Sequence, residues 1–226
     1  MLKTIDNLCA KLGGERVSEF SPRVTHLVTV ANNEQGGNGP RLCRRTLKYL
    51  QCVVGLCWIV GYEWVIESVV NKQWIAEAQF EIDGDTQQPE DTSVSHSLFW
   101  RQSFSRRLFE NTHFYLFGDF SVPTKKEIRS LVEAGGGQLV ASEAQLFSRE
   151  LLRIPLQPGC RLVVLSDVEA TSVGAAQQFF DRTARCPVSL RWLFDTISSF
   201  SFALPPTDYF LVAPPAHLHD QFSLAF

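Results

Sequence analysis

The sequence has little net charge, and this limits what it can bind. It contains 21 lysines and arginines against 24 aspartates and glutamates, so its formal net charge is −3. Such a balance gives no bulk attraction to DNA or to an anionic membrane, and any anion must be bound by a local group of residues. The sequence also lacks an apolar run of roughly 18 residues, the length that a membrane span needs. We therefore expect no membrane partner.

Metal-binding and catalytic motifs are missing as well. The six cysteines form no C-x-x-C pair, and no cysteine or histidine spacing suggests zinc, so we expect neither a metal nor another cofactor. Several cysteines lie in apolar stretches, which is typical of free thiols in a reducing intracellular compartment. The patterns G-x-S-x-G, G-x-x-x-x-G-K-[ST] and H-E-x-x-H are absent. These absences favour a binding protein over an enzyme.

What the sequence does contain is a repeated unit. The segments "LKTIDNLCAKLGG" (residues 2–14) and "SVPTKKEIRSLVEAGGG" (residues 121–137) both place apolar residues at helical spacing and end in glycines. A short strand is expected after each helix, "RVSEF" in the first copy and "QLV" in the second. In the second copy we expect Ser121 to cap the helix and Pro123 to lie in its first turn.

The remaining parts of the two copies also match. "VTHLVTV" (24–30) and "RLVVLS" (161–166) are predicted to be buried strands. "CWIVGYEWVIESVV" (57–70) and "CPVSLRWLFDTISSF" (186–200) each predict a strand that runs into a helix near a tryptophan. Alternating helices and strands favour the α/β class, with small parallel sheets flanked by helices.

The second copy has one additional predicted strand. It lies in "LFENTHFYLFGDF" (108–120), and the first copy has no counterpart, because its first helix begins almost at residue 1. We therefore predict a first repeat at residues 1–82 that lacks its first strand, and a second repeat at 108–215. Residues 83–107 are predicted to be a linker, because their first part is polar and nearly free of apolar residues. Residues 216–226 are predicted to be a tail.

One short basic segment stands out in the first copy. In "RRTLKYL", Arg44, Arg45 and Lys48 surround Thr46 directly before a predicted short helix. Positive charge is unfavourable at a helix N-terminus, which is itself electropositive. An anion bound there would relieve the repulsion and would meet the free backbone N–H groups of the first turn. The alternative is that these residues form only a solvated basic face.

The ordered set of motifs resembles a known family. Glycines after the first helix, "VTHLV", "RTLKYL", the tryptophan-led helices, "LFENTHFYLFGDF" and "AGGGQLV" together resemble tandem BRCT repeats. The likeness is to the group formed by the breast-cancer susceptibility protein type one and its RING-domain partner. This resemblance implies a parallel four-stranded sheet per repeat, with the two repeats packed head to tail. It also implies a nuclear adaptor of the DNA damage response that binds phosphoserine peptides and recruits repair proteins to chromatin.

The resemblance also assigns roles to individual residues. It implies that Thr46 and Lys48 hold the phosphate and that the backbone of Arg45 holds the peptide. The walls of an inter-repeat groove for an aromatic peptide side chain would be formed by Leu50, Pro123, Leu190 and Phe194. Leu190 stands where the family has a peptide-binding arginine. The Ser/Thr-Gly element of the phosphate pocket would precede residue 1, so we expect either a half-built pocket or a naturally longer chain.

Three alternatives remain open from the sequence. The first is phosphate-independent recognition of a nucleosome, of a ubiquitin-marked histone or of a scaffold protein. Separately from these alternatives, the resemblance implies a RING-domain partner bound through regions outside this chain. The second is that the groove residues are plain inter-repeat packing. The third is a fragment of an enzyme, because BRCT repeats also accompany catalytic domains, although nothing in these residues supports it.

Overall fold

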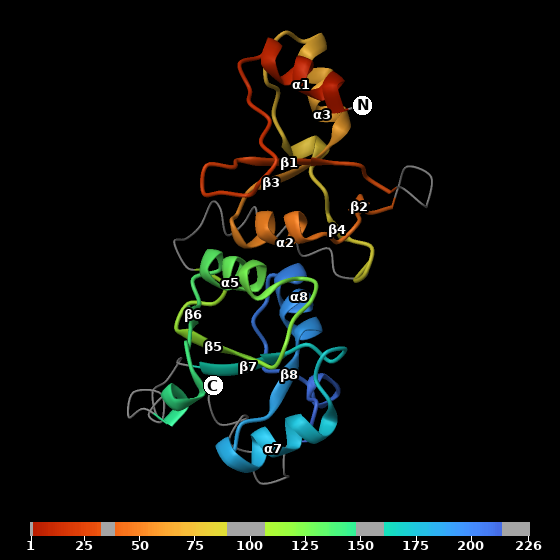
Figure 1. Ribbon diagram of the computed structural model, residues 1–226. Helices are drawn as coiled ribbons and strands as arrows, with labels where there is room; N and C mark the ends of the chain where they lie inside the picture. Colours follow the sequence, from red (N-terminus) through yellow and green to blue (C-terminus); the bar gives the residue numbers. More distant parts are fainter. Residues whose placement is uncertain (1, 33–38, 90–106, 148–160, 214–226) are drawn as a thin grey trace. The chain divides into compact units, whose positions relative to one another are not determined.

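The computed structural model describes residues 2–32, 39–89, 107–147 and 161–213. The chain divides into two compact units (Figure 1). The first comprises Met1–Ser105 with Ser198–Phe200, and the second comprises Arg106–Ile197 with Ser201–Phe226. Among the described residues, no helix is both long and apolar enough to cross a bilayer.

The first unit is built from α1 (Leu2–Lys11), α2 (Leu47–Val54) and α3 (Tyr62–Val70) around short parallel strands. Strand β1 (His26–Thr29) pairs with β3 (Trp58–Gly61), and β2 (Leu42–Cys43) pairs with β4 (Gly84–Asp85). Helices α1 and α3 lie on one side of the β1–β3 pair and α2 lies on the other (Figure 1). A single 3-10 turn, η1 (Ala78–Phe80), precedes β4.

Apolar side chains between α3 and the β1–β3 pair form the core of this unit. Val60, Trp64, Val65 and Phe80 are buried there, and Leu8 of α1 and Val28 of β1 pack against them. The Trp64 ring is stacked between two others, with its centroid 4.7 Å from that of His26 and 4.7 Å from that of Trp74. The core therefore fixes α3 against the sheet and leaves α2 to occupy the opposite face.

The second unit has the fuller sheet. Its strands are β5 (Thr112–Phe117), β6 (Gln138–Leu139), β7 (Arg161–Ser166) and β8 (Pro187–Ser189), in the order β6-β5-β7-β8, and all of them are parallel. Helices α5 (Lys125–Ala134) and α8 (Leu190–Ser198) lie on one side of it, and α7 (Val173–Thr183) lies on the other (Figure 1). The 3-10 turns η2 (Glu143–Phe147) and η4 (Thr207–Tyr209) complete the unit.

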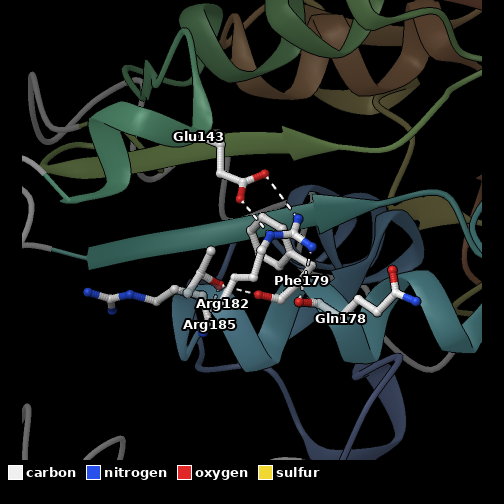
Figure 2. A network of polar contacts seen from close by, with 6 residues as sticks. Glu143, Gln178, Phe179, Arg182 and Arg185 are labelled. Atoms are coloured by element: carbon white, nitrogen blue, oxygen red, sulfur yellow. Dashed lines mark hydrogen bonds and ion pairs between the residues drawn. The ribbon is translucent and has the colours of Figure 1, made fainter.

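The core beneath α7 is held by aromatic packing and by a surface ion pair. Phe179 is fully buried and meets the rings of Tyr115 and Phe117, with centroids 6.0 and 4.3 Å away. Figure 2 shows how Arg182, one turn further along α7, reaches across to Glu143 of η2, with its Nε 3.2 Å from the carboxylate. The ion pair thus fastens η2 over the aromatic core.

The structure corrects two of the predicted elements. Residues 16–20, predicted to form a strand, have no regular structure, and Arg16 instead donates to the carboxylate of Asp6 on α1. Helix α5 is capped by Thr124 rather than by Ser121, because Thr124 and Glu127 form a reciprocal capping box. Pro123 consequently precedes the cap, after a cis peptide bond, and does not lie in the first turn.

The prediction that the linker begins at residue 83 is also wrong at its start. Asp83 accepts a hydrogen bond from the Arg41 N–H at 2.7 Å, and the next two residues form strand β4. Most of the remaining predicted linker and the whole predicted tail lie outside the described residues.

Candidate phosphate-binding site

The short helix predicted after the basic segment is present as α2. Thr46 is the N-cap residue, with extended backbone angles of φ −127° and ψ 164°, and its hydroxyl accepts a hydrogen bond from the Tyr49 N–H at 3.2 Å. The helix is anchored by its buried face, which comprises Tyr49, Leu50, Cys52, Val53 and Val54. This buried face fixes the orientation of α2, and Thr46 and Lys48 lie exposed at its start.

Exposed cations flank this helix start. The first turn of α2 contains no acidic residue. Lys48 and Arg44 are both exposed, and neither forms a hydrogen bond or an ion pair within the part of the chain that the structure describes. Because the helix dipole adds a partial positive charge at the same place, the arrangement repels cations and attracts an anion.

Helices α5 and α7 also have a side-chain N-cap, and their starts can be compared with that of α2. In α5 the Glu127 carboxylate closes the helix start from within, accepting from the Thr124 N–H at 2.7 Å and from its hydroxyl at 2.8 Å. These two hydrogen bonds hold the pKa of Glu127 below its ordinary value. Helix α2 has the same kind of cap, but no carboxylate of its own first turn takes the place that Glu127 fills in α5.

The equivalent start of α7 lacks the positive charge. Its N-cap is Ser172, and the position that corresponds to Lys48, two residues after the cap, is Gly174. The neighbouring hydroxyls are already paired with each other, since Ser166 Oγ donates to the Phe117 carbonyl and lies 2.8 Å from Thr171 Oγ1. The start of α7 therefore does not reproduce the start of α2.

The structure brings together only some of the site residues predicted from the sequence. Thr46 and Lys48 lie at the same helix start, and Arg45 directly precedes them. Leu50 is buried on α2, Leu190 is the buried first residue of α8, and Phe194 and Pro123 are half-buried. Leu50 belongs to the first unit and the other three groove residues to the second. The shared groove therefore stays a prediction.

Sequence reasoning missed one residue beside the site. The side chain of Asp85 is only 1% exposed and lies 3.0 Å from Nε of Arg45, whose side chain is 11% exposed. The sequence pattern places Asp85 in a linker without a partner. An acid in a polar stretch gives no sign of burial, and the only hint is its position directly after the apolar residues that precede β4.

Several cysteine thiols of the described residues are buried. Burial raises the pKa of Cys43 to about 12 and that of Cys186 to about 11. The pKa of Cys52 is raised by a hydrogen bond with Cys57 and by burial. Such thiols are protonated at neutral pH and are poor nucleophiles. Among the described residues, no group of three or more His, Cys, Asp and Glu side chains could hold a metal ion.

Comparison with known proteins identifies the fold. No protein-family profile matches the chain. Over 87% of its length, it superposes on the BRCT5–BRCT6 domains of S. pombe Brc1, covering 87% of that structure with a TM-score of 0.56 and 16% identity. The chain has the tandem BRCT fold. A second tandem structure, that of Rtt107p in complex with a phosphorylated histone, gives a TM-score of 0.57 at 14% identity, over 94% of this chain and 87% of the chain in that structure.

The sequence relatives belong to the two groups that this chain resembles. It is 29% identical to BRCA1-associated RING domain protein 1 of Arabidopsis thaliana over 72% of the chain and 22% of that protein. The Homo sapiens protein of the same name is 30% identical over 62% of the chain and 16% of that protein. The breast cancer type 1 susceptibility protein homolog of Mus musculus is 26% identical over 70% of the chain and 8% of that protein. The BRCT pair thus spans less than a quarter of each relative.

Proposed function

We propose that the BRCT pair is an adaptor that binds phosphoserine peptides in the DNA damage response. The observation that carries the proposal is the start of α2, where a capped helix with no internal carboxylate is flanked by exposed cations. A phosphate there would accept charge-assisted hydrogen bonds from Lys48 and from backbone N–H groups. Each such bond is worth roughly 1.5–3 kcal/mol.

The known structures and relatives support the partner class. Rtt107p, which shares the fold, was solved in complex with a phosphorylated histone. By analogy, we propose that the partners are phosphorylated proteins of the damage response at chromatin, and that the protein acts in the nucleus. Association with a RING-domain partner would use regions outside this chain. The proposed activity is binding and involves no catalysis.

A peptide titration with a matched pair of variants tests the proposal. Fluorescence anisotropy would be measured with phosphoserine-x-x-Phe peptides and with their unphosphorylated counterparts. Lys48→Met removes the cation of α2, whereas Lys126→Met removes the cation at the same position of α5, two residues after its cap. Because Glu127 already closes the start of α5, Lys126 should not contribute.

We expect the unsubstituted chain and Lys126→Met to prefer the phosphorylated peptide, and Lys48→Met to lose that preference. Equal binding of both peptides by the unsubstituted chain would refute phosphate recognition. It would favour the rival function, phosphate-independent recognition of a nucleosome, of a ubiquitin-marked histone or of a scaffold protein. Nucleosome binding that is unchanged by Lys48→Met would distinguish that rival directly.

A further inference from the structure

A buried ion pair lies directly behind the candidate phosphate site. Arg45 Nε is 3.0 Å from Asp85 Oδ1, and the side chains are 11% and 1% exposed. The same carboxylate oxygen accepts a second hydrogen bond, from the Gln87 N–H at 2.8 Å. Arg45 is the residue before the N-cap Thr46, so this pair fixes the chain one residue away from the site.

The backbone around Asp85 holds the same stretch from a second direction. Strands β2 and β4 place Cys43 opposite Asp85, and the Thr86 N–H donates to the Cys43 carbonyl at 3.0 Å. The chain from Cys43 to Thr46 is therefore joined to β4 by backbone pairing at its start and by the Arg45 side chain near its end. Arg44 and Lys48 remain exposed, whereas Arg45 is turned inward.

Stability alone does not explain why an acid occupies this position. Removing a carboxylate and a guanidinium from water is costly, and buried ion pairs are often no better for stability than apolar residues of similar size. The second carboxylate oxygen of Asp85 is buried, and it accepts no hydrogen bond from any residue that the structure describes. A buried group left unsatisfied calls for an explanation, and in some proteins such an ionic group fixes a geometry rather than adding stability.

We propose that Asp85 is a positioning residue of the phosphate site, an inference that rests on the proposed function. By holding Arg45 inward, it sets the extended backbone at Thr46 from which the first turn of α2 begins. The Thr46 hydroxyl, the N–H groups of that turn and the Lys48 ammonium then face one ligand together. Asp85 itself does not touch the phosphate.

Two substitutions of neighbouring acids separate this role from a general effect on folding. Asp85→Asn keeps an oxygen that can accept from the Gln87 N–H but removes the charge that holds Arg45. Asp83→Asn is the matched control, because Asp83 lies two residues earlier and accepts from the Arg41 N–H at 2.7 Å instead. Each variant would be titrated with the phosphoserine-x-x-Phe peptide and its unphosphorylated counterpart, and its thermal denaturation would be followed in parallel.

We expect Asp85→Asn to weaken binding of the phosphorylated peptide about tenfold, which is the effect of losing about 1.4 kcal/mol. Binding of the unphosphorylated peptide should not change, and Asp83→Asn should stay within about twofold of the unsubstituted chain for both peptides. In the Lys48→Met background, Asp85→Asn should have no further effect, because residues that act through one site are not additive.

The outcomes are distinguishable. A folded Asp85→Asn variant with an unchanged preference for the phosphorylated peptide overturns the positioning role and leaves the proposed function intact. If the unsubstituted chain shows no preference, both fail. Should Asp85→Asn not fold, Arg45→Lys tests the same idea, because it retains the charge but not the planar guanidinium. We expect Arg45→Lys to have a phosphate preference weaker than that of the unsubstituted chain but stronger than that of Lys48→Met. A preference equal to that of the unsubstituted chain would overturn the inference.

Discussion

Replacing Thr46 by alanine should weaken both a helix and a ligand site, and a second variant can separate the two effects. The Thr46 hydroxyl accepts from the Tyr49 N–H at 3.2 Å. Removing such a cap typically costs about 1 kcal/mol of stability. For a unit of about 100 residues, this corresponds to a fall in melting temperature of about 4–8 °C. If the hydroxyl also donates to a bound phosphate, affinity for the phosphorylated peptide should fall at least about tenfold.

Ser172→Ala provides the matched control. Its hydroxyl accepts from the Ala175 N–H at 3.2 Å and caps α7 in the same manner, but no cation stands two residues further on. Differential scanning calorimetry and peptide anisotropy would be run on both variants at a temperature at which each is folded. We expect similar stability losses and a loss of affinity for Thr46→Ala alone. Equal affinity losses in both variants, or none in Thr46→Ala, would contradict the assignment of the site to α2.

Three further substitutions test the fold. Phe179→Ala empties the fully buried centre of the second core and should cost about 3–5 kcal/mol in chemical denaturation. Gly118→Ala should cost about 1–2 kcal/mol in the same assay, because φ is +81° and the new Cβ would lie 2.5 Å from Thr171 Oγ1. Glu127→Gln should flatten the acid limb of the stability profile. The folded pKa of Glu127 lies below its ordinary value of 4.5, so its contribution is present above that pH and is lost as pH falls. An unchanged acid limb would contradict the capping box.

The helices and strands that the sequence predicted correctly are those with strong apolar patterning. Residues 186–200 and 161–166 appear as β8, α8 and β7 because their buried faces are continuous in sequence. The "RVSEF" segment has a similar local pattern but forms no strand, because a strand requires a hydrogen-bonded neighbour, and Arg16 is drawn to Asp6 instead. The cap of α5 is encoded in the capping-box sequence "TKKE". The start of this helix is therefore set by Thr124, not by Ser121 or Pro123.

The candidate site also has parts that the local sequence predicts and one that only folding brings together. The short helix after Thr46 followed from local sequence, and the cations before Leu50 indicated an anion site at its start. The ion pair of Arg45 did not follow from the sequence, because its partner Asp85 is 40 residues away and only the β2–β4 pairing brings the two together. A charge count treats the three cations of "RRTLKYL" alike, whereas folding turns one of them inward and leaves two exposed.

The ring stack of the first unit gives that unit an optical signal of its own. Trp64 and Trp74 are stacked 4.7 Å apart and 20° from parallel, close enough for their indole transitions to couple, whereas Trp192 of the second unit meets Phe202 edge-on. Coupled indoles give a paired band in circular dichroism that disappears when the stack separates. The melting of the first unit could therefore be followed in the intact chain, without labels.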